Sequence, residues 1–253
     1  MLKFPAIITA SSSSPTIVSF ADGTPAELAA MLAAHDAGDI DIMDYWSLGD
    51  KRTISHSAMA ATNVGETHAA QNRSWVIMDT GAQSGYVFSD NTPVHFVVGC
   101  EDSFDEVGYM NSTNTNAGSW DSSARRAWCN NELRASFDED TRALFKQFKT
   151  VTAETYNGST LKTSLDYFAL FTEKEVFGTQ TYSNATEAAA LKQIKYYEVT
   201  ANRVKKVNGS AVYWWERSPR SDNSYDFCSV YKNGTASIFN ASATRGLAPF
   251  GCI

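Results

Sequence analysis

The stretch that decides the fold lies near the C-terminus and reads Tyr213-Trp214-Trp215-Glu216-Arg217-Ser218-Pro219. Two short runs of alternating character follow it, at 227–231 and 236–239. Between them stands Lys232-Asn233-Gly234, and an Asn-Gly pair favours a type I′ hairpin because both central residues of that turn need positive φ. The sequence therefore predicts a terminal antiparallel sheet, with a break at 217–219 and a closing segment at 245–250 that packs into the domain core.

Two segments in the middle of the chain accompany this tail. The first is Ser119-Trp120-Asp121-Ser122-Ser123 followed by Arg125-Arg126-Ala127-Trp128-Cys129-Asn130-Asn131-Glu132-Leu133, and the second is Asp166-Tyr167-Phe168-Ala169-Leu170-Phe171-Thr172-Glu173-Lys174-Glu175. Together with the Trp-rich Arg-Ser-Pro strand, the hairpin and the closing segment, these motifs resemble a phage- and prophage-associated family of unknown function. That family is related to the formylglycine-generating-enzyme-like branch of the C-type-lectin-like fold.

The resemblance covers roughly residues 42–253. It implies an α+β fold: a C-type-lectin-like domain at 42–253, with short mixed or antiparallel strands and two or more helices, preceded by an extended arm and one helix at 1–41. The superfamily includes receptor-binding and hypervariable display proteins of phages and bacteria. We assign Trp214, Trp215, Arg217 and Arg245 to the framework, because an aromatic pair beside an Arg-Ser-Pro segment is first a packing feature.

The N-terminal region predicts an arm and a helix. Residues 1–20 are Ser-rich and lack a core-forming pattern, so we expect them to act as a tether or to donate a strand to a neighbour. Thr24-Pro25-Ala26-Glu27 is a capping box with Pro at the first helical position, which predicts a helix over 25–37 that Gly38 ends. Its apolar face is narrow and needs a partner; this face consists of Leu28, Met31 and Leu32.

The remaining elements follow from residue patterns. Runs of β-branched and aromatic residues predict strands at 52–55, 75–78 and 94–99. Helices are expected at 122–136, with Trp128 facing the core, and at 139–148 and 185–195.

Composition limits the classes of partner. The net charge is −7 and the 21 basic residues form no run longer than two, so no basic stripe is expected, which argues against a nucleic-acid partner. No stretch approaches the ~20 apolar residues of a membrane span, and the start at Met1-Leu2-Lys3-Phe4-Pro5 lacks the apolar region of a signal peptide. We therefore expect a protein made in the host cytoplasm that stays there or leaves it by assembly or lysis.

The four cysteines are Cys100, Cys129, Cys228 and Cys252. They form no Cys-x-x-Cys pair, so a zinc site is not expected. Buried reduced thiols are the first interpretation and a Cys228–Cys252 disulfide is the alternative. The formylglycine-generating relatives are oxidases that hold copper with two cysteines close in sequence near the C-terminus. Because Cys228 and Cys252 are 24 residues apart, the chain departs from that pattern, and we expect no cofactor.

The histidines suggest structural roles. His56 and His68 lie near Glu66 and Asp79 in sequence, but their spacing of twelve residues fits neither a helical nor a hairpin metal site. His35, at the end of the first predicted helix, is placed to interact favourably with the helix dipole. His95 lies within a predicted strand, and no nucleophile motif accompanies it.

The terminal sheet offers a candidate binding face. Tyr, Asn, Ser and Asp there alternate with apolar residues, a composition that suits recognition, although a passive polar face is the alternative. The candidate ligand-binding residues are Asn223, Tyr225, Asp226, Ser229, Tyr231, Phe239 and Asn240. The motifs of calcium-dependent sugar-binding lectins, Glu-Pro-Asn or Gln-Pro-Asp with Trp-Asn-Asp, are missing, so we expect no metal ligands.

These features favour a non-enzymatic phage virion or prophage structural protein. In this interpretation the protein is an oligomer of identical chains, attached through its N-terminal arm to other phage proteins. It presents its lectin-like face to a host-surface glycan or protein, or decorates a capsid or tail. A cellular ligand-binding module and a divergent formylglycine-generating-type oxidase are the alternatives.

Overall fold

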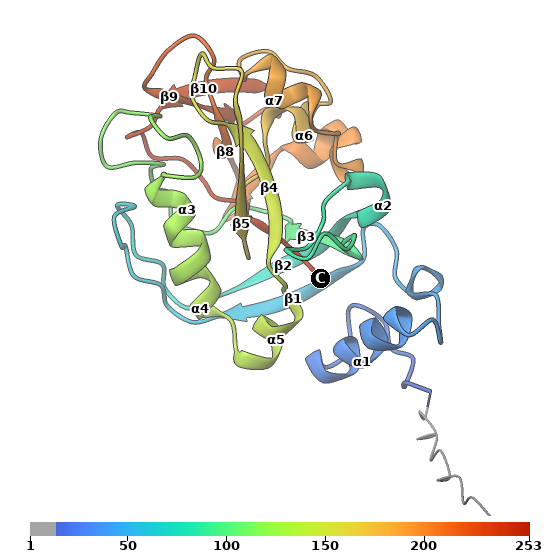
Figure 1. Ribbon diagram of the computed structural model, residues 1–253. Coiled ribbons are helices and arrows are strands. Elements are labelled where there is room, and N and C mark those ends of the chain that lie inside the picture. Colours follow the sequence, from blue (N-terminus) through green and yellow to red (C-terminus); the bar gives the residue numbers. More distant parts are fainter. Residues whose placement is uncertain (1–13) are drawn as a thin grey trace, which may run out of the picture.

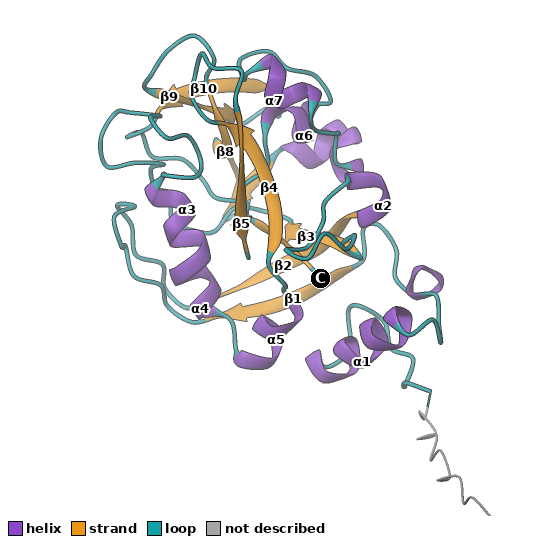
Figure 2. Ribbon diagram, in the orientation of Figure 1, coloured by secondary structure: helices purple, strands orange, loops and turns teal. Residues whose placement is uncertain are grey.

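The computed structural model describes residues 14–253, and the fold is that of this part of the chain. It is a mixed α+β fold of short strands and few helices (Figure 1 and Figure 2). The strands are β1 (Lys51–His56), β2 (Gln71–Thr80), β3 (Phe96–Cys100), β4 (Phe148–Ala153), β5 (Leu161–Asp166), β6 (Lys205–Val207), β7 (Ser210–Val212), β8 (Trp214–Pro219), β9 (Asp226–Val230), β10 (Ala236–Asn240) and β11 (Phe250–Cys252). One sheet has the order β1-β2-β3-β11 and another the order β10-β9-β8, while β4-β5 and β6-β7 are hairpins, and all pairings are antiparallel.

The helices are short. They are α1 (Pro25–Asp36), α2 (Gly81–Ser84), α3 (Ala124–Trp128), α4 (Arg134–Ser136), α5 (Glu139–Leu144), α6 (Glu173–Phe177) and α7 (Ala185–Ala189), with 3₁₀ turns at Ile42–Asp44, Lys195–Glu198 and Thr200–Arg203. A π-helical segment at Cys129–Leu133 joins α3 to α4, which confirms the helix predicted at 122–136. Within residues 14–253, no helix combines the length and apolarity that crossing a membrane requires.

Two predicted helices are shorter in the structure. The helix predicted to reach residue 148 ends at Leu144, because Phe145 has an extended backbone and Phe148 already begins β4. The helix predicted over 185–195 ends at Ala189, and the chain resumes helical geometry only in the 3₁₀ turn at Lys195.

The terminal sheet is confirmed, with a different turn. Strand β9 pairs with β10 so that Val230 lies opposite Ala236, and with β8 so that Val230 lies opposite Trp214. Gly234 has a φ of 85°, but Asn233 is not among the non-glycine residues with positive φ. The loop is therefore not a type I′ turn. That geometry occurs instead between β6 and β7, where Asn208 and Gly209 have φ of 49° and 78°.

The Arg-Ser-Pro segment does not break its strand. Strand β8 continues to Pro219, and its pairing with β9 shifts register between Trp215 and Pro219. Proline is tolerated there because β8 is an edge strand with a bulge, where a missing N–H does not interrupt a continuous ladder. The closing segment then leaves this sheet, and β11 pairs with β3 in the four-stranded sheet, where Phe250 stacks on Phe171 with ring centroids 4.1 Å apart.

The predicted N-terminal helix is confirmed as α1, including its capping box between Thr24 and Glu27. Its face of Leu28, Met31 and Leu32 is buried in the same hydrophobic cluster as the strands of the main sheet. Of the predicted arm, residues 1–13 lie outside the described residues. At its end, Phe20 is buried and packs against Trp46, whose Nε1 donates to the carbonyl of Val18 (3.0 Å).

The motifs of the middle segments meet at one buried carboxylate. Asp166 is fully buried and accepts hydrogen bonds from Trp120 Nε1 (2.9 Å), Thr150 Oγ1 (2.6 Å), Arg126 Nε (2.6 Å) and Asn130 Nδ2 (3.0 Å). These contacts link the α3 helix to the β4-β5 hairpin, so the side chains that carry the sequence motif serve the framework.

A second buried ion pair connects the other motifs. Arg217 of β8 donates from both terminal nitrogens to the carboxylate of Glu175 in α6, at 2.8 and 2.9 Å. Tyr86 donates to the same carboxylate. Burial of an unpaired charge is costly, and this bidentate geometry compensates both groups. The framework role expected for Arg217, Trp214 and Trp215 agrees with their complete burial.

Candidate functional site

The structure divides the predicted binding residues into exposed and buried groups. Tyr225 and Phe239 are exposed, with 46% and 42% of their surface accessible. Asn240 is also exposed, whereas Asn223 and Tyr231 are half-buried. Asp226 and Ser229 are buried in β9, so they do not belong to an exposed face. The alternation assumed from sequence fails because β9 is the central strand, buried along its whole length.

Asp226 and Asn223 hold the loop before β9. Arg220 Nη1 and Asn223 Nδ2 donate to one oxygen of Asp226 at 3.0 and 2.8 Å. The amide oxygen of Asn223 accepts the backbone N–H groups of Tyr225 and Asp226, which is the geometry of an Asx turn. The contacted oxygen of Asp226 and the side chain of Asn223 are thus bonded within the chain, and they shape the loop that carries Tyr225.

A compact aromatic group forms where the three strands of the terminal sheet meet the following loop. Tyr213, just before β8, lies 4.5 Å from Tyr231, just after β9, and 6.3 Å from Phe239 of β10, measured between ring centroids. Arg245 places its guanidinium 3.4 Å from the centroid of Phe239 and 4.8 Å from that of Tyr213. We call Tyr213, Tyr231, Phe239 and Arg245 the aromatic face.

Arg245 is more than a framework residue in this arrangement. Among residues 14–253 it has no carboxylate partner within ion-pair distance, and its Nε has no hydrogen-bond acceptor, while Nη1 donates to the carbonyl of Thr244 (2.6 Å). Burial lowers the pKa of its guanidinium from the ordinary value, and the neighbouring Tyr213 partly opposes this shift. The guanidinium borders a hollow of about 210 Å³, which is also lined by Val107, Val212 and Thr244. An unpaired cation beside aromatic rings is a ready contact for a partner.

The aromatic face depends on the loop that contains residues 104–109. Gly108 and Arg245 exchange two backbone hydrogen bonds of 2.9 Å, and Trp215 Nε1 donates to the Gly108 carbonyl (2.8 Å). A side chain at 108 would overlap Glu66, since a Cβ atom there would lie 1.7 Å from its carboxylate. Glycine is therefore required where this loop crosses the buried carboxylate.

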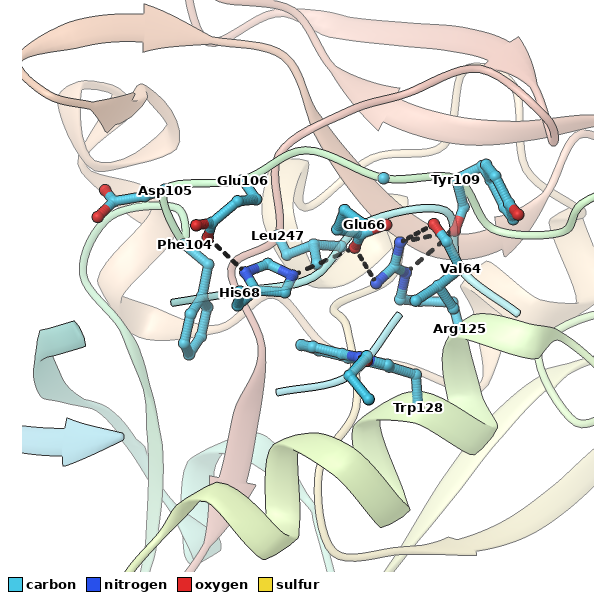
Figure 3. Close-up of polar contacts among 12 residues, drawn as sticks. Val64, Glu66, His68, Phe104, Asp105, Glu106, Tyr109, Arg125, Trp128 and Leu247 are labelled. Atoms are coloured by element: carbon cyan, nitrogen blue, oxygen red, sulfur yellow. Dashed lines mark hydrogen bonds and ion pairs between the residues drawn. The ribbon is translucent and has the colours of Figure 1, made fainter. Parts of the chain in front are cut away.

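Beneath the loop lies a buried row of charged side chains, which Figure 3 shows. Arg125 Nη1 contacts Glu66 Oε1 at 2.7 Å, and the same oxygen lies 3.3 Å from His68 Nε2. On its other side His68 Nδ1 lies 2.8 Å from Glu106 Oε2. The His68 ring therefore lies between two carboxylates, and the Arg125 guanidinium lies at one end of the row.

Aromatic rings enclose this row. His68 is fully buried between Trp128 and Phe104, with ring centroids 5.0 and 5.7 Å away, and the Arg125 guanidinium lies 5.1 Å from the Trp128 ring (Figure 3). Arg125 also donates to the carbonyl of Tyr109 (2.8 Å). Only Glu106 reaches solvent, with about a third of its side chain exposed. The row therefore fixes the 104–109 loop to helix α3 and gives no substrate access to His68.

The four histidines do not form a metal site. Glu66 and His68 come together, but His56 lies elsewhere, bonded to Ser136 Oγ (2.8 Å) and to Trp75 Nε1 (3.1 Å). Asp79 accepts the backbone N–H of Lys195 instead. Over residues 14–253, no three His, Cys, Asp or Glu side chains are grouped so that they could hold a metal ion.

The cysteines do not fit the copper pair of the formylglycine-generating oxidases. All four are buried free thiols, as expected, and the alternative Cys228–Cys252 bond is not formed. Cys228 lies in β9 of the terminal sheet and Cys252 in β11 of the main sheet. Burial raises the pKa of both thiols well above the ordinary value, which disfavours the thiolate form that binds metals.

Two features of the site escaped the sequence interpretation. Tyr213 was not among the expected face residues, because the β8–β9 register that places it beside Tyr231 is not determined by the predicted β9–β10 hairpin. The row of His68, Glu106, Glu66 and Arg125 joins three separate segments, and no spacing rule links residues so far apart.

Comparison with known proteins identifies a family and no function. A family model with the description "Domain of unknown function (DUF6273)" matches residues 95–253. No curated protein and no solved structure shows a significant match. The matched region begins just before β3 and ends after β11, so it omits β1 and β2, which extend the same sheet. Because the match covers more than half of the chain, the protein belongs to this family of unknown function.

Proposed function

We propose that this chain is a non-enzymatic binding protein of C-type-lectin-like type, and that it serves as a structural component of a phage or prophage particle. The aromatic face of the terminal sheet is its contact surface for a protein of the host envelope. The observation that carries the proposal is the grouping of Tyr213, Tyr231 and Phe239 around the unpaired guanidinium of Arg245.

The chemistry of the face favours a protein partner. Tyrosine, phenylalanine and arginine are enriched at the centres of protein interfaces, where they supply large contact areas and hydrogen bonds together. Phe239 keeps 42% of its surface exposed in the isolated chain, and Val107, which lines the hollow with Arg245, keeps 39%. Burial of these apolar groups by a partner is favourable, at about 25 cal/mol per Å². The small hollow next to Arg245 adds a concave point for an anchoring side chain.

The assignment to a phage particle rests on the motif resemblance. The residues that carry it, Asp166 and Arg217 among them, are fully buried in the framework. They therefore support a shared fold rather than a shared ligand. The protein should be recovered with purified particles of the phage that encodes it, after density-gradient centrifugation and immunoblotting. Recovery only from the soluble cell fraction would favour the alternative of a cellular binding module.

Attachment to envelope material tests the contact surface. Purified protein should bind envelope fractions from a susceptible strain. The Arg245→Met variant should bind them more weakly, because methionine keeps much of the side-chain volume over Phe239 but lacks the positive charge. Protease treatment of the envelopes should abolish binding, whereas periodate oxidation of glycans should leave it intact. Binding that survives protease treatment and is abolished by periodate would identify the partner as a glycan. Equal binding of Arg245→Met and wild type, with equal melting temperatures, would contradict the assigned surface.

A further inference from the structure

A large cleft lies far in sequence from the aromatic face. Its volume is about 1090 Å³, and it lies between the C-terminal end of α1, the 88–95 segment and the α4–α5 region (Figure 1 shows these elements). Sites for small organic ligands usually occupy about 300–1000 Å³. Its walls include the aromatic side chains of Phe88, Phe145 and Tyr167. The cleft is therefore large enough for a complete small molecule with an apolar body.

Two guanidinium groups in this cleft lack partners. The Arg134 guanidinium lies 3.8 Å from the centroid of the Tyr167 ring, and its buried Nε has no hydrogen-bond acceptor. Neither Arg134 nor Arg142 has a carboxylate within 4.0 Å among residues 14–253, nor does either side chain donate a hydrogen bond there. Buried polar groups are normally satisfied, so a partly buried arginine without an acceptor indicates room for an anionic one.

The acidic residues of the cleft do not neutralise these arginines. Asp36 is engaged by His95 Nε2 at 3.2 Å and by Lys146 Nζ at 4.0 Å. Asp90 accepts hydrogen bonds from the backbone and hydroxyl of Thr92. Glu139, in the first turn of α5, is exposed. The positive groups Arg134 and Arg142 therefore remain available.

The histidines complete the wall near α1. His35 Nδ1 lies 3.3 Å from both the carbonyl oxygen of Ile40 and the backbone nitrogen of Ile42, which hold the ring against the end of α1. The His35 and His95 rings meet edge to face, with centroids 5.2 Å apart. The basic residue expected at the end of the first helix thus contacts the main domain through His95 and borders the cleft.

We propose that this cleft binds a small organic anion. Its carboxylate or phosphate group accepts hydrogen bonds from Arg134 and Arg142, and its apolar body lies against Tyr167 and Phe88. Guanidinium groups match the planar geometry of a carboxylate and the oxygens of a phosphate, which lysine does not. The proposal does not depend on the aromatic face, since no residue is shared between the two sites.

A fluorescent probe with the same two chemical parts tests the proposal. The probe is 8-anilinonaphthalene-1-sulfonate, which joins an aromatic body to an anionic group, and its uncharged counterpart is N-phenyl-1-naphthylamine. We expect saturable binding of the sulfonate and a dissociation constant at least about tenfold higher in Arg134→Met/Arg142→Met, as loss of a charge-assisted hydrogen bond implies. The uncharged probe should change by less than about twofold. Lys206→Met, which removes one exposed positive charge in β6, is the matched control.

The single variant Arg142→Met tests whether weaker binding reflects a folding defect. Arg142 makes no side-chain hydrogen bond or ion pair among the described residues, so this substitution should not disturb the fold. It should retain the wild-type melting temperature and still weaken sulfonate binding. Displacement of the probe by phenyl phosphate or by benzoate supports the proposal and identifies the preferred anion. An absence of saturable binding to wild type, displacement by neither compound, or wild-type affinity in the folded arginine variants would overturn it.

Discussion

At the scale of single residues, some buried charged groups are held by several hydrogen bonds at once. Asp166 accepts four hydrogen bonds, from Trp120 before α3, Arg126 in α3, Asn130 in the π-helical segment and Thr150 in β4. Asp166→Ala would leave Nε of Arg126 and the buried indole N–H of Trp120 without an acceptor. Removing one partner from a buried charge network costs about 3–5 kcal/mol. Urea unfolding should show a loss of this size, while Asp222→Ala, an exposed control, should show less than about 1 kcal/mol.

Trp128 is the residue whose orientation the sequence defined best. It is 1% exposed, and its Nε1 donates to the carbonyl of Ala60 (3.1 Å). Trp128→Ala should lower the unfolding free energy by about 3–5 kcal/mol through cavity formation. Trp128→Phe, which keeps most of the ring volume, should lose clearly less. Near-equal stability of Trp128→Ala and wild type in chemical denaturation would refute the core position.

Protonation of the buried His56 makes the unfolding free energy depend on pH. Burial, aided by the positive charge of Arg73, lowers the pKa of His56 to about 3, below the ~6.5 of an unfolded chain. The folded state therefore resists protonation of His56, so its stabilising contribution is complete above pH ~6.5 and is lost as pH falls toward 3. At pH 5 the loss amounts to about 2 kcal/mol.

A variant separates this effect from opposing groups. Burial raises the pKa of the Glu187 carboxyl to about 7. Protonation of this group therefore increases the unfolding free energy as pH falls over part of the same range. His56→Gln keeps a donor and an acceptor for Ser136 and Trp75 but cannot be protonated. The difference in unfolding free energy between wild type and His56→Gln should therefore shift by about 2 kcal/mol from pH 7 to pH 5. A difference independent of pH would show that His56 does not resist protonation.

At the scale of elements, strands and caps with local signals were predicted well and contacts between distant segments were not. The capping box at Thr24, the strand runs and the 122–136 helix each follow from neighbouring residues. The turn at Asn233 was misassigned because an Asn-Gly pair also fits a loop with one left-handed glycine. The burial of Asp226 and Ser229 depends on a strand order that no local pattern specifies.

The 104–109 loop is the element on which the aromatic face depends. A Cβ at Gly108 would overlap the Glu66 carboxylate and disturb the contacts to His68 and Arg125. Gly108→Ala should lower stability by about 1–3 kcal/mol, the usual range for overpacking, and should also displace Arg245. Gly38→Ala is the control: Gly38 has φ of 79° and open space around it, so only backbone strain of about 1 kcal/mol applies. A Gly108→Ala variant that melts at the wild-type temperature would contradict this role of the loop.

At the scale of the whole molecule, the N-terminal and C-terminal parts share one sheet, because β1 and β2 join β3 and β11. The family match from residue 95 therefore covers only part of this structural unit. The two open features, the aromatic face and the cleft near α1, use different residues of one framework. The sequence led to the terminal sheet as a candidate face. It did not lead to the cleft, whose walls come from segments that only the tertiary fold brings together.

The most direct measurement of the central claim compares two exposed aromatic sites in one binding assay. Tyr213→Ala/Phe239→Ala removes two rings of the aromatic face, and Tyr45→Ala removes an exposed ring, 42% accessible, near α1. Dissociation constants for protease-sensitive envelope material should rise at least about a hundredfold in the double variant, as loss of interface hot spots implies, and stay unchanged in Tyr45→Ala. Wild-type affinity in a double variant that unfolds at the wild-type temperature would contradict the claim that this face binds a partner.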